Sequence, residues 1–148
     1  MDIRTFLGWV ICGEGCFSRA GWGSESRKNQ RRFRFYLAMH ERDSELIELM
    51  RKELGVGSIN KYMSRTTPMI QFHVGSHRSC VEKVIPYFEG ILIVHKKKQF
   101  EDWNGQLLDY VASHHERTSI PKSALIVFTP YITSQTTRLP MYSRMYCD

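Results

Sequence analysis

A single carboxylate stands between two glycines near the start of the chain, in the stretch FLGWVICGEGCF that begins at Phe6. Glu14 lies where an apolar run with helical spacing gives way to an aromatic run with strand character. One interpretation is that Gly13 and Gly15 end a helix and that the Glu14 carboxylate is merely solvated. The other is that Glu14 holds a hard cation such as Mg²⁺, which takes carboxylate and backbone oxygens, and that the glycines let another backbone approach closely.

Polar and basic side chains alternate with apolar ones in three strand-like stretches, at 31–40, 57–63 and 69–75. In the first, Phe33, Phe35 and Leu37 fall on one face of a strand, as core residues do. The opposite face of the three stretches carries Arg32, Arg34, Tyr36, Asn60, Tyr62, Gln71 and His73. Long donors mixed with amide and aromatic groups suit phosphates and the base edges of a DNA major groove. The alternative is an ordinary solvated face, since basic residues are common on exposed strands.

These residues need a scaffold, and the periodicity predicts one. Helical spacing is found at 3–12, 44–54 and 96–115, a shorter helix at 79–88 is expected to break before Pro86, and a further strand is expected at 16–22. The predicted fold class is α+β, with the order αββαββα, an antiparallel twisted sheet, helices on one face and an open concave face.

Length and charge limit the function. A chain of 148 residues is predicted to form a single domain, 1–148, with a core at about 1–115 and a tail at 116–148. The net charge of +6 indicates an anionic partner, with nucleic acid ahead of a membrane surface. No apolar run is long enough for a membrane span, and the N-terminus does not resemble a secretory signal, so we expect an intracellular protein without membrane association.

Three segments in order make the sequence similar to the LAGLIDADG homing endonucleases, over about residues 5–112. They are LGWVICGEG followed by CF, then FRFYLAMHERDSELIELMRKELGVGSI, then IPYFEGILIVHKKKQFEDW. In that family the motif is a helix that packs against its counterpart at the centre of the molecule. The resemblance therefore implies that Glu14, with the backbone of Gly13, binds a catalytic Mg²⁺ or Mn²⁺ ion. One motif in the chain implies a homodimer, because a single carboxylate does not complete such a site.

The resemblance implies further catalytic residues. The basic residue of the active site falls in the run at 96–98, with Lys97 as the first choice and Lys96 as the second. Many relatives have a water-positioning glutamine where this chain has Met39, so we expect His40 to take that role, unless it is an exposed surface histidine. Two sets complete the expected sites. The DNA-binding residues are Ser18, Trp22, Arg32, Arg34, Tyr36, Asn60, Tyr62, Gln71, His73 and Lys98, and the dimer interface residues are Leu7, Gly8, Ile11 and Cys12. Gly8 and Cys12 form the small-residue contact unless the motif shifts by one residue.

The function expected from the resemblance is sequence-specific hydrolysis of double-stranded DNA on a long near-palindromic site, by an enzyme typically encoded within an intron or intein. The first alternative is a maturase-like or regulatory nucleic-acid-binding protein that keeps the fold without cleavage, with intron RNA as a candidate partner. A basic domain of unrelated role is the second.

Overall fold

The structure, a computed structural model, describes residues 1–21 and 31–114. The expected contact Trp22 and the tail at 116–148 lie outside these residues. The elements are α1 (Ile3–Glu14), β1 (Gly15–Gly21), β2 (Arg31–His40), the 3₁₀ turn η2 (Glu41–Asp43), α2 (Ser44–Leu54), β3 (Ser58–Ser64), β4 (Thr67–Val74), α3 (His77–Ser79), the π-helical turn η3 (Cys80–Val84), α4 (Ile85–Phe88) and α5 (Val94–Ser113).

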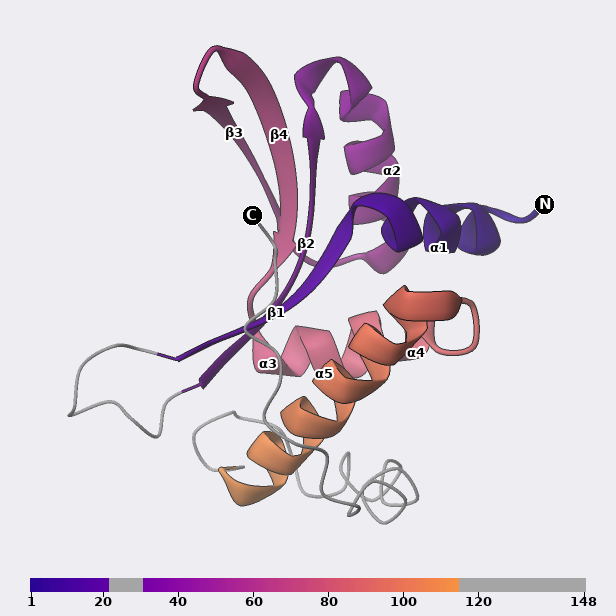
Figure 1. Ribbon diagram of the computed structural model, residues 1–148, viewed down its shortest axis with the longest axis vertical. Coiled ribbons are helices and arrows are strands. Elements are labelled where there is room, and N and C mark those ends of the chain that lie inside the picture. Colours follow the sequence, from indigo (N-terminus) through magenta and orange to yellow (C-terminus); the bar gives the residue numbers. More distant parts are fainter. Residues whose placement is uncertain (22–30, 115–148) are drawn as a thin grey trace.

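The four strands form one antiparallel sheet in the order β1-β2-β4-β3. The helices α1 and α2 lie to the right of β2 and β4 in Figure 1, and the helices α4 and α5 lie below these two strands. The predicted mixed helix and antiparallel-sheet fold is confirmed.

The alternation in the strands decides which face is covered. Phe33, Phe35 and Leu37 of β2 are fully buried, as are Ile70 and Phe72 of β4. They pack with Ile47, Met50, Val81, Phe88, Trp103 and Leu107 from the helices. The face opposite these residues carries Arg34, Tyr36 and His73, which the helices do not cover, so one side of the sheet keeps its polar residues.

The first helix is held at both ends. The Asp2 carboxylate accepts from the backbone N–H of Thr5 at 2.8 Å and caps the N-terminus of α1. The Arg4 guanidinium donates to the carbonyl oxygens of Tyr87 at 2.7 Å and Glu89 at 2.8 Å. These carbonyls lie at the C-terminal end of α4, where backbone acceptors lack helical partners. Arg4 therefore fixes α1 to α4, and with it the position of the motif.

The edge strand β1 is covered by side chains of α5. Trp103 donates from Nε1 to the carbonyl oxygen of Ser18 at 3.1 Å, and Arg19 hydrogen-bonds to Gln106. The ring of Phe17 lies 5.2 Å from the rings of both Phe100 and Trp103. An edge strand otherwise presents unpaired carbonyls to other chains, so these contacts protect β1.

Several boundaries differ from the prediction. The first helix continues through Glu14, and β1 follows it at the next residue. The helix at 79–88 does not break before Pro86, because the π-helical turn runs directly into α4 with Pro86 in its first turn, where a missing N–H costs little. Among the described residues, no helix is long and apolar enough to cross a membrane.

Candidate nucleic-acid interface and active site

Glu14 is the last residue of α1, and its side chain is exposed at the point where the chain enters the sheet. The glycines on either side have different surroundings. A Cβ on Gly15 would lie 2.6 Å from the Ile11 side chain and 2.9 Å from its carbonyl oxygen, so the abrupt change from helix to strand requires a glycine. A Cβ on Gly13 would meet nothing within 4 Å. Gly15 therefore serves the fold of this chain, whereas Gly13 leaves open space beside Glu14.

The lysine that reaches the motif is Lys96, in the first turn of α5. Its Nζ donates to the carbonyl oxygen of Gly15 at 2.6 Å and to Oε1 of Gln99 at 2.9 Å. Burial lowers the pKa of Lys96, and electrostatic interactions with Cys12 and Glu14 partly oppose that shift. Lys97 and Lys98 are exposed. Of the three lysines, Lys96, the second choice from the sequence, is the one that contacts the residue after Glu14, whereas the first choice, Lys97, is exposed.

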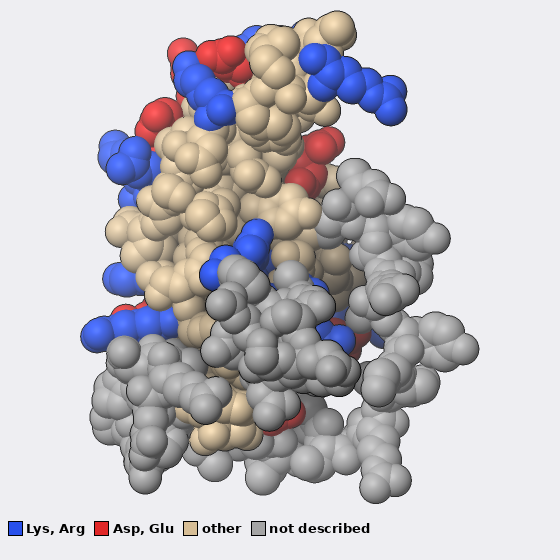
Figure 2. Space-filling view, turned by 90° about the vertical axis from the view of Figure 1, so that its left-hand side faces the viewer, with Lys and Arg blue, Asp and Glu red and all other residues tan. Residues whose placement is uncertain are grey.

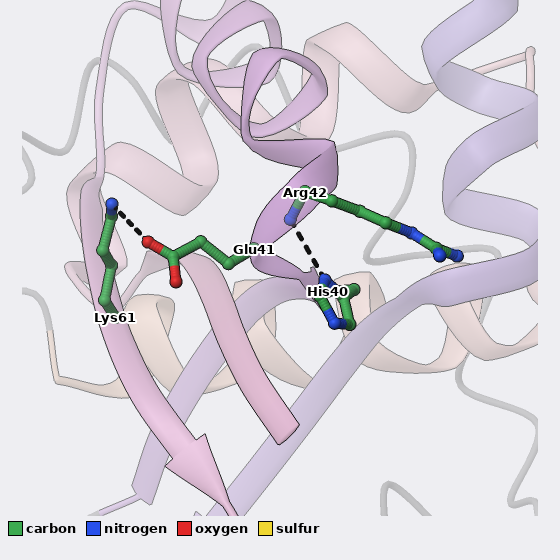
Figure 3. Close-up of polar contacts among 4 residues, drawn as sticks. All are labelled: His40, Glu41, Arg42 and Lys61. Carbon is green, nitrogen blue, oxygen red and sulfur yellow. Dashed lines mark hydrogen bonds and ion pairs between the residues drawn. The ribbon is translucent and has the colours of Figure 1, made fainter. Parts of the chain in front are cut away.

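His40 ends β2 on the open side of the sheet, and Figure 3 shows how it is held. Its Nδ1 accepts from the backbone N–H of Arg42 at 3.1 Å, which caps the 3₁₀ turn η2. On the other side of the turn, Glu41 accepts from Lys61 at 2.6 Å, and this contact lowers the pKa of the Glu41 carboxyl. The pairing of Gly15 with Leu37 places His40 about 10 Å along the strand from the motif junction. The Nδ1 atom of His40 thus has a structural role, and only Nε2 is left to contact water or a ligand.

The predicted DNA-binding residues of the strands share one face. Ser18 pairs with Arg34, Tyr36 with His73, and Asn60 with Gln71, and directly opposed residues point to the same side of a sheet. Arg32 and Tyr62 lie on the same face, because residues two positions apart in a strand point to the same side of the sheet. Figure 2 views the molecule from the left-hand side of Figure 1, where Lys and Arg side chains lie around and within a broad surface of uncharged residues, with some Asp and Glu side chains near its edges. Lys98 is not part of the face, because it lies on α5, whose buried residues pack against the other side of the sheet.

The four predicted interface residues do not form the exposed face of α1. Leu7 and Ile11 are fully buried in the core of this chain, and Gly8 is covered by Ile91, whose side chain would lie 2.9 Å from an added Cβ. Cys12 is half-buried and packs against the same core. These residues therefore have little or no surface to offer a partner, because the chain's own sheet and helices occupy the face that the sequence assigned to a second copy.

The exposed face of α1 is nevertheless apolar. Ile3 is 49% exposed, Phe6 40% and Trp9 61%. With Gly13 and the half-buried Val10, which also packs against the core, they occupy one side of the helix at spacings of three, four and seven residues. We call these five residues the α1 stripe. The signal was present in the sequence as an apolar helix with no polar face, which is a sign of a helix covered on more than one side.

The oxygen ligands at the motif fit a hard divalent cation, because both the Glu14 carboxylate and the carbonyls of the last turn of α1 are oxygen donors at an exposed helix end. Among residues 1–21 and 31–114, no group of three or more His, Cys, Asp or Glu side chains is placed to hold a metal. One chain thus offers one carboxylate here, and further ligands must come from a second motif, water or DNA.

The sequence matches the LAGLIDADG endonuclease family over residues 10–106, which is more than half of the chain. A search of curated proteins finds no match. The meganuclease I-SmaMI, crystallised with uncleaveable DNA, is similar with a TM-score of 0.66 and 23% identity over 90% of this chain and 45% of that one. The homing endonuclease I-TnaI has a TM-score of 0.65 and 23% identity over 93% of this chain and 90% of that one.

The intron-encoded homing endonuclease I-CeuI, complexed with DNA, has a TM-score of 0.67 and 17% identity over 91% of this chain and 66% of that one. At these identities the likeness concerns the fold, and the chain spans less than half of I-SmaMI. The family assignment rests on the sequence match together with the helix that carries Glu14 into the sheet. The chain belongs to the LAGLIDADG endonuclease family.

Proposed function

We propose that this protein is a metal-dependent endonuclease that cuts double-stranded DNA as a homodimer at a long near-palindromic site. The observation that carries the proposal is the position of Glu14. Its exposed carboxylate lies at the end of the α1 stripe, beside Lys96, and at the border of the open polar face of the sheet. The α1 stripe, the charged side chains of Glu14 and Lys96, and the polar face of the sheet therefore lie next to one another.

The α1 stripe supports pairing with a second copy. Exposed apolar side chains grouped on one helix face are typical of an interaction surface. A twofold axis through this face would bring two copies of Gly13 and Glu14 together, because an isologous interface repeats the same residues on both sides. The open space over Gly13 gives a second helix room to approach.

Each residue at the motif has its own role in the proposed reaction. Glu14 and the Gly13 carbonyl would hold Mg²⁺ or Mn²⁺, and such an ion stabilises the charge of the leaving oxygen and favours ionisation of an attacking water. Lys96 carries a partly desolvated positive charge next to Glu14, where it can stabilise negative charge on a phosphate. Gln99 and the Gly15 carbonyl hold the Lys96 ammonium in position.

The open face of the sheet is proposed to read the duplex. Gln71 and Asn60, paired across β4 and β3, carry the amide groups that suit adenine edges. The twist of the sheet lets neighbouring strands follow a major groove. In this arrangement α1 and the motif lie at the centre of the dimer, and the two sheets extend outward over the two half-sites.

The test is a cleavage assay on a randomised DNA library with Mg²⁺, using wild type and Glu14→Gln. We expect Glu14→Gln to abolish cleavage and to preserve or tighten DNA binding, because it removes a negative charge near phosphates. Glu48→Gln, an exposed carboxylate on α2, is the matched control and should cleave normally. Cleavage by Glu14→Gln at the wild-type rate would refute the proposed role of Glu14.

A second candidate function is nucleic-acid binding without cleavage, in the manner of a maturase or regulator. Two observations favour it. Met39 packs partly against the core and its thioether is only a weak hydrogen-bond acceptor, and Nδ1 of His40 accepts from the Arg42 backbone. If wild type binds DNA or structured intron RNA but cuts no DNA with Mg²⁺ or Mn²⁺, this function replaces the first.

A further inference from the structure

The sheet has a recess where β4 leaves β2. The pairing of β2 with β4 begins at Phe35 and Val74, whereas the earlier residues of β2 are paired with β1. After Val74 the chain turns away through Gly75 and Ser76 into α3. The resulting cavity has a volume of about 480 Å³. It is lined by Arg32, Arg34, Gly57, Ser58, His73, Val74, Gly75, Ser76 and Ser79, which we call the β2–β4 recess.

The lining of the recess is rich in hydrogen-bond donors and positive charge. Arg32 and Arg34 contribute two guanidinium groups from successive outward positions of one strand. Ser58, Ser76 and Ser79 add three hydroxyls, and none of the described lining residues is acidic. Planar guanidinium donors together with hydroxyls match the oxygens of a phosphate group. An apolar or cationic ligand would find few suitable partners in such a lining.

Two contacts define one wall of the recess. The Ser58 hydroxyl lies 2.9 Å from Nδ1 of His73 and holds the imidazole ring against rotation. The other ring nitrogen, Nε2, lies only 2.9 Å from where a Cβ on Gly75 would stand. The backbone of Gly75 is not in the left-handed region, so a side chain there is limited by the space that the His73 ring occupies and not by backbone conformation. A side chain at this position would displace His73 and intrude on the cavity.

From this geometry we infer that the β2–β4 recess binds a phosphodiester group of the DNA backbone and anchors the duplex at a distance from the motif. The inference rests on the proposed DNA-binding function and assigns a different role to Arg34, which the sequence associates with base edges. Arg34 lies about 10 Å along β2 from Leu37, the partner of Gly15. The recess therefore positions the duplex without taking part in the chemistry at Glu14.

The test measures binding of full-length chain to three unrelated duplexes over a range of KCl concentrations. Arg34→Ala should weaken binding to all three by the same factor and reduce the salt slope by about 2, because each protomer of the proposed dimer loses one phosphate contact. Gly75→Ala should weaken binding likewise without any change of charge. Arg78→Ala is the matched control, because Arg78 pairs with Glu82 and does not line the recess. Its binding should stay within about twofold of wild type.

A second arm titrates inorganic phosphate and follows the imidazole NMR signals of His73, with thermal melting to verify that each variant folds. We expect phosphate to shift these signals in wild type but not in Arg34→Ala, and to compete with DNA. Phosphate binding without any effect of Arg34→Ala on DNA affinity would assign the recess to free phosphate and overturn the inference. A changed base preference in Arg34→Ala would also overturn it, in favour of base reading.

The two proposals fail in different ways. If wild type binds DNA and cuts it, but Arg34→Ala and Gly75→Ala keep the wild-type affinity and salt slope, only the phosphate role of the recess is refuted. If folded wild type binds none of the duplexes, the proposed function fails and the DNA anchor fails with it.

Discussion

The Lys96 ammonium donates a 2.6 Å hydrogen bond to the carbonyl oxygen of Gly15, the residue that follows Glu14. This contact joins the start of α5 to the junction of α1 and β1. It brings the positive charge of Lys96 close to the carboxylate of Glu14, although Lys96 and Glu14 are 82 positions apart in the sequence. The contact also distinguishes Lys96 from Lys97, because the Lys97 side chain carries the same ammonium group but is exposed.

Lys96→Ala should therefore slow DNA cleavage by about 10²–10³-fold, the usual effect of removing one donor to developing charge. Lys97→Ala is the control and should cleave within a few-fold of wild type. Single-turnover cleavage with saturating enzyme is the measurement, since it separates the chemical step from binding. Equal losses in the two variants would mean that the run of lysines acts only as a charged surface.

The two glycines beside Glu14 should respond differently to alanine. Gly15→Ala should lower stability by about 1–3 kcal/mol, because the new methyl group would overlap Ile11. Gly13→Ala should leave the monomer at least as stable, since an alanine in a helix is favoured by about 0.5–1 kcal/mol, but it should weaken dimerisation and cleavage. Urea unfolding and sedimentation give the two readouts. A strongly destabilised Gly13→Ala monomer would contradict the proposed role of the open space.

The α1 stripe predicts that Trp9→Glu dissociates the dimer while the monomer stays folded, because Trp9 is 61% exposed in the single chain. The dissociation constant should rise at least tenfold, or about 1.4 kcal/mol. Met63→Glu provides the control, because Met63 is 63% exposed on β3, away from α1. Sedimentation velocity checks both variants. Wild type that sediments as a monomer yet cuts both strands in one encounter would exclude the homodimer.

Tyr87 predicts a loss of stability at high pH. Burial and the neighbouring Glu53 carboxylate raise the pKa of Tyr87 from 10.0 to about 12, and its hydroxyl donates to Glu53 at 3.3 Å. The folded protein thus holds this proton more tightly than the unfolded chain. The stabilisation is complete below pH 10 and is lost as the pH rises from about 10 to about 12.

Tyr87→Phe removes this titration, so the difference in melting temperature between wild type and variant should shrink across that window. Tyr62→Phe, on the exposed strand β3, should instead follow the wild-type curve. A constant difference between wild type and Tyr87→Phe from pH 8 to pH 12 would show that the phenol proton does not contribute.

Local patterns were sufficient for the elements and for one face of the sheet. Phe33, Phe35 and Leu37 alternate with Arg32, Arg34 and Tyr36, and a strand must place the two sets on opposite sides. The end of the helix at 44–54 was equally clear, because a glycine follows it in the sequence, and the structure places Gly55 in the left-handed region that favours glycine at a helix end. The glycines that flank Glu14 likewise marked the end of the first helix, which the structure places at Glu14.

Only the tertiary structure decided what covers each surface. The sequence showed α1 to be apolar on most sides, but periodicity alone does not say that Leu7 and Ile11 meet the chain's own core while Phe6 and Trp9 remain outside. Lys96 and Lys97 are adjacent in sequence, and the direction in which α5 crosses the edge of β1 brings Lys96 to Gly15. The β2–β4 recess depends on the residue at which β4 leaves the sheet. Such features arise from contacts between distant segments, and the spacing of residues along one segment does not contain them.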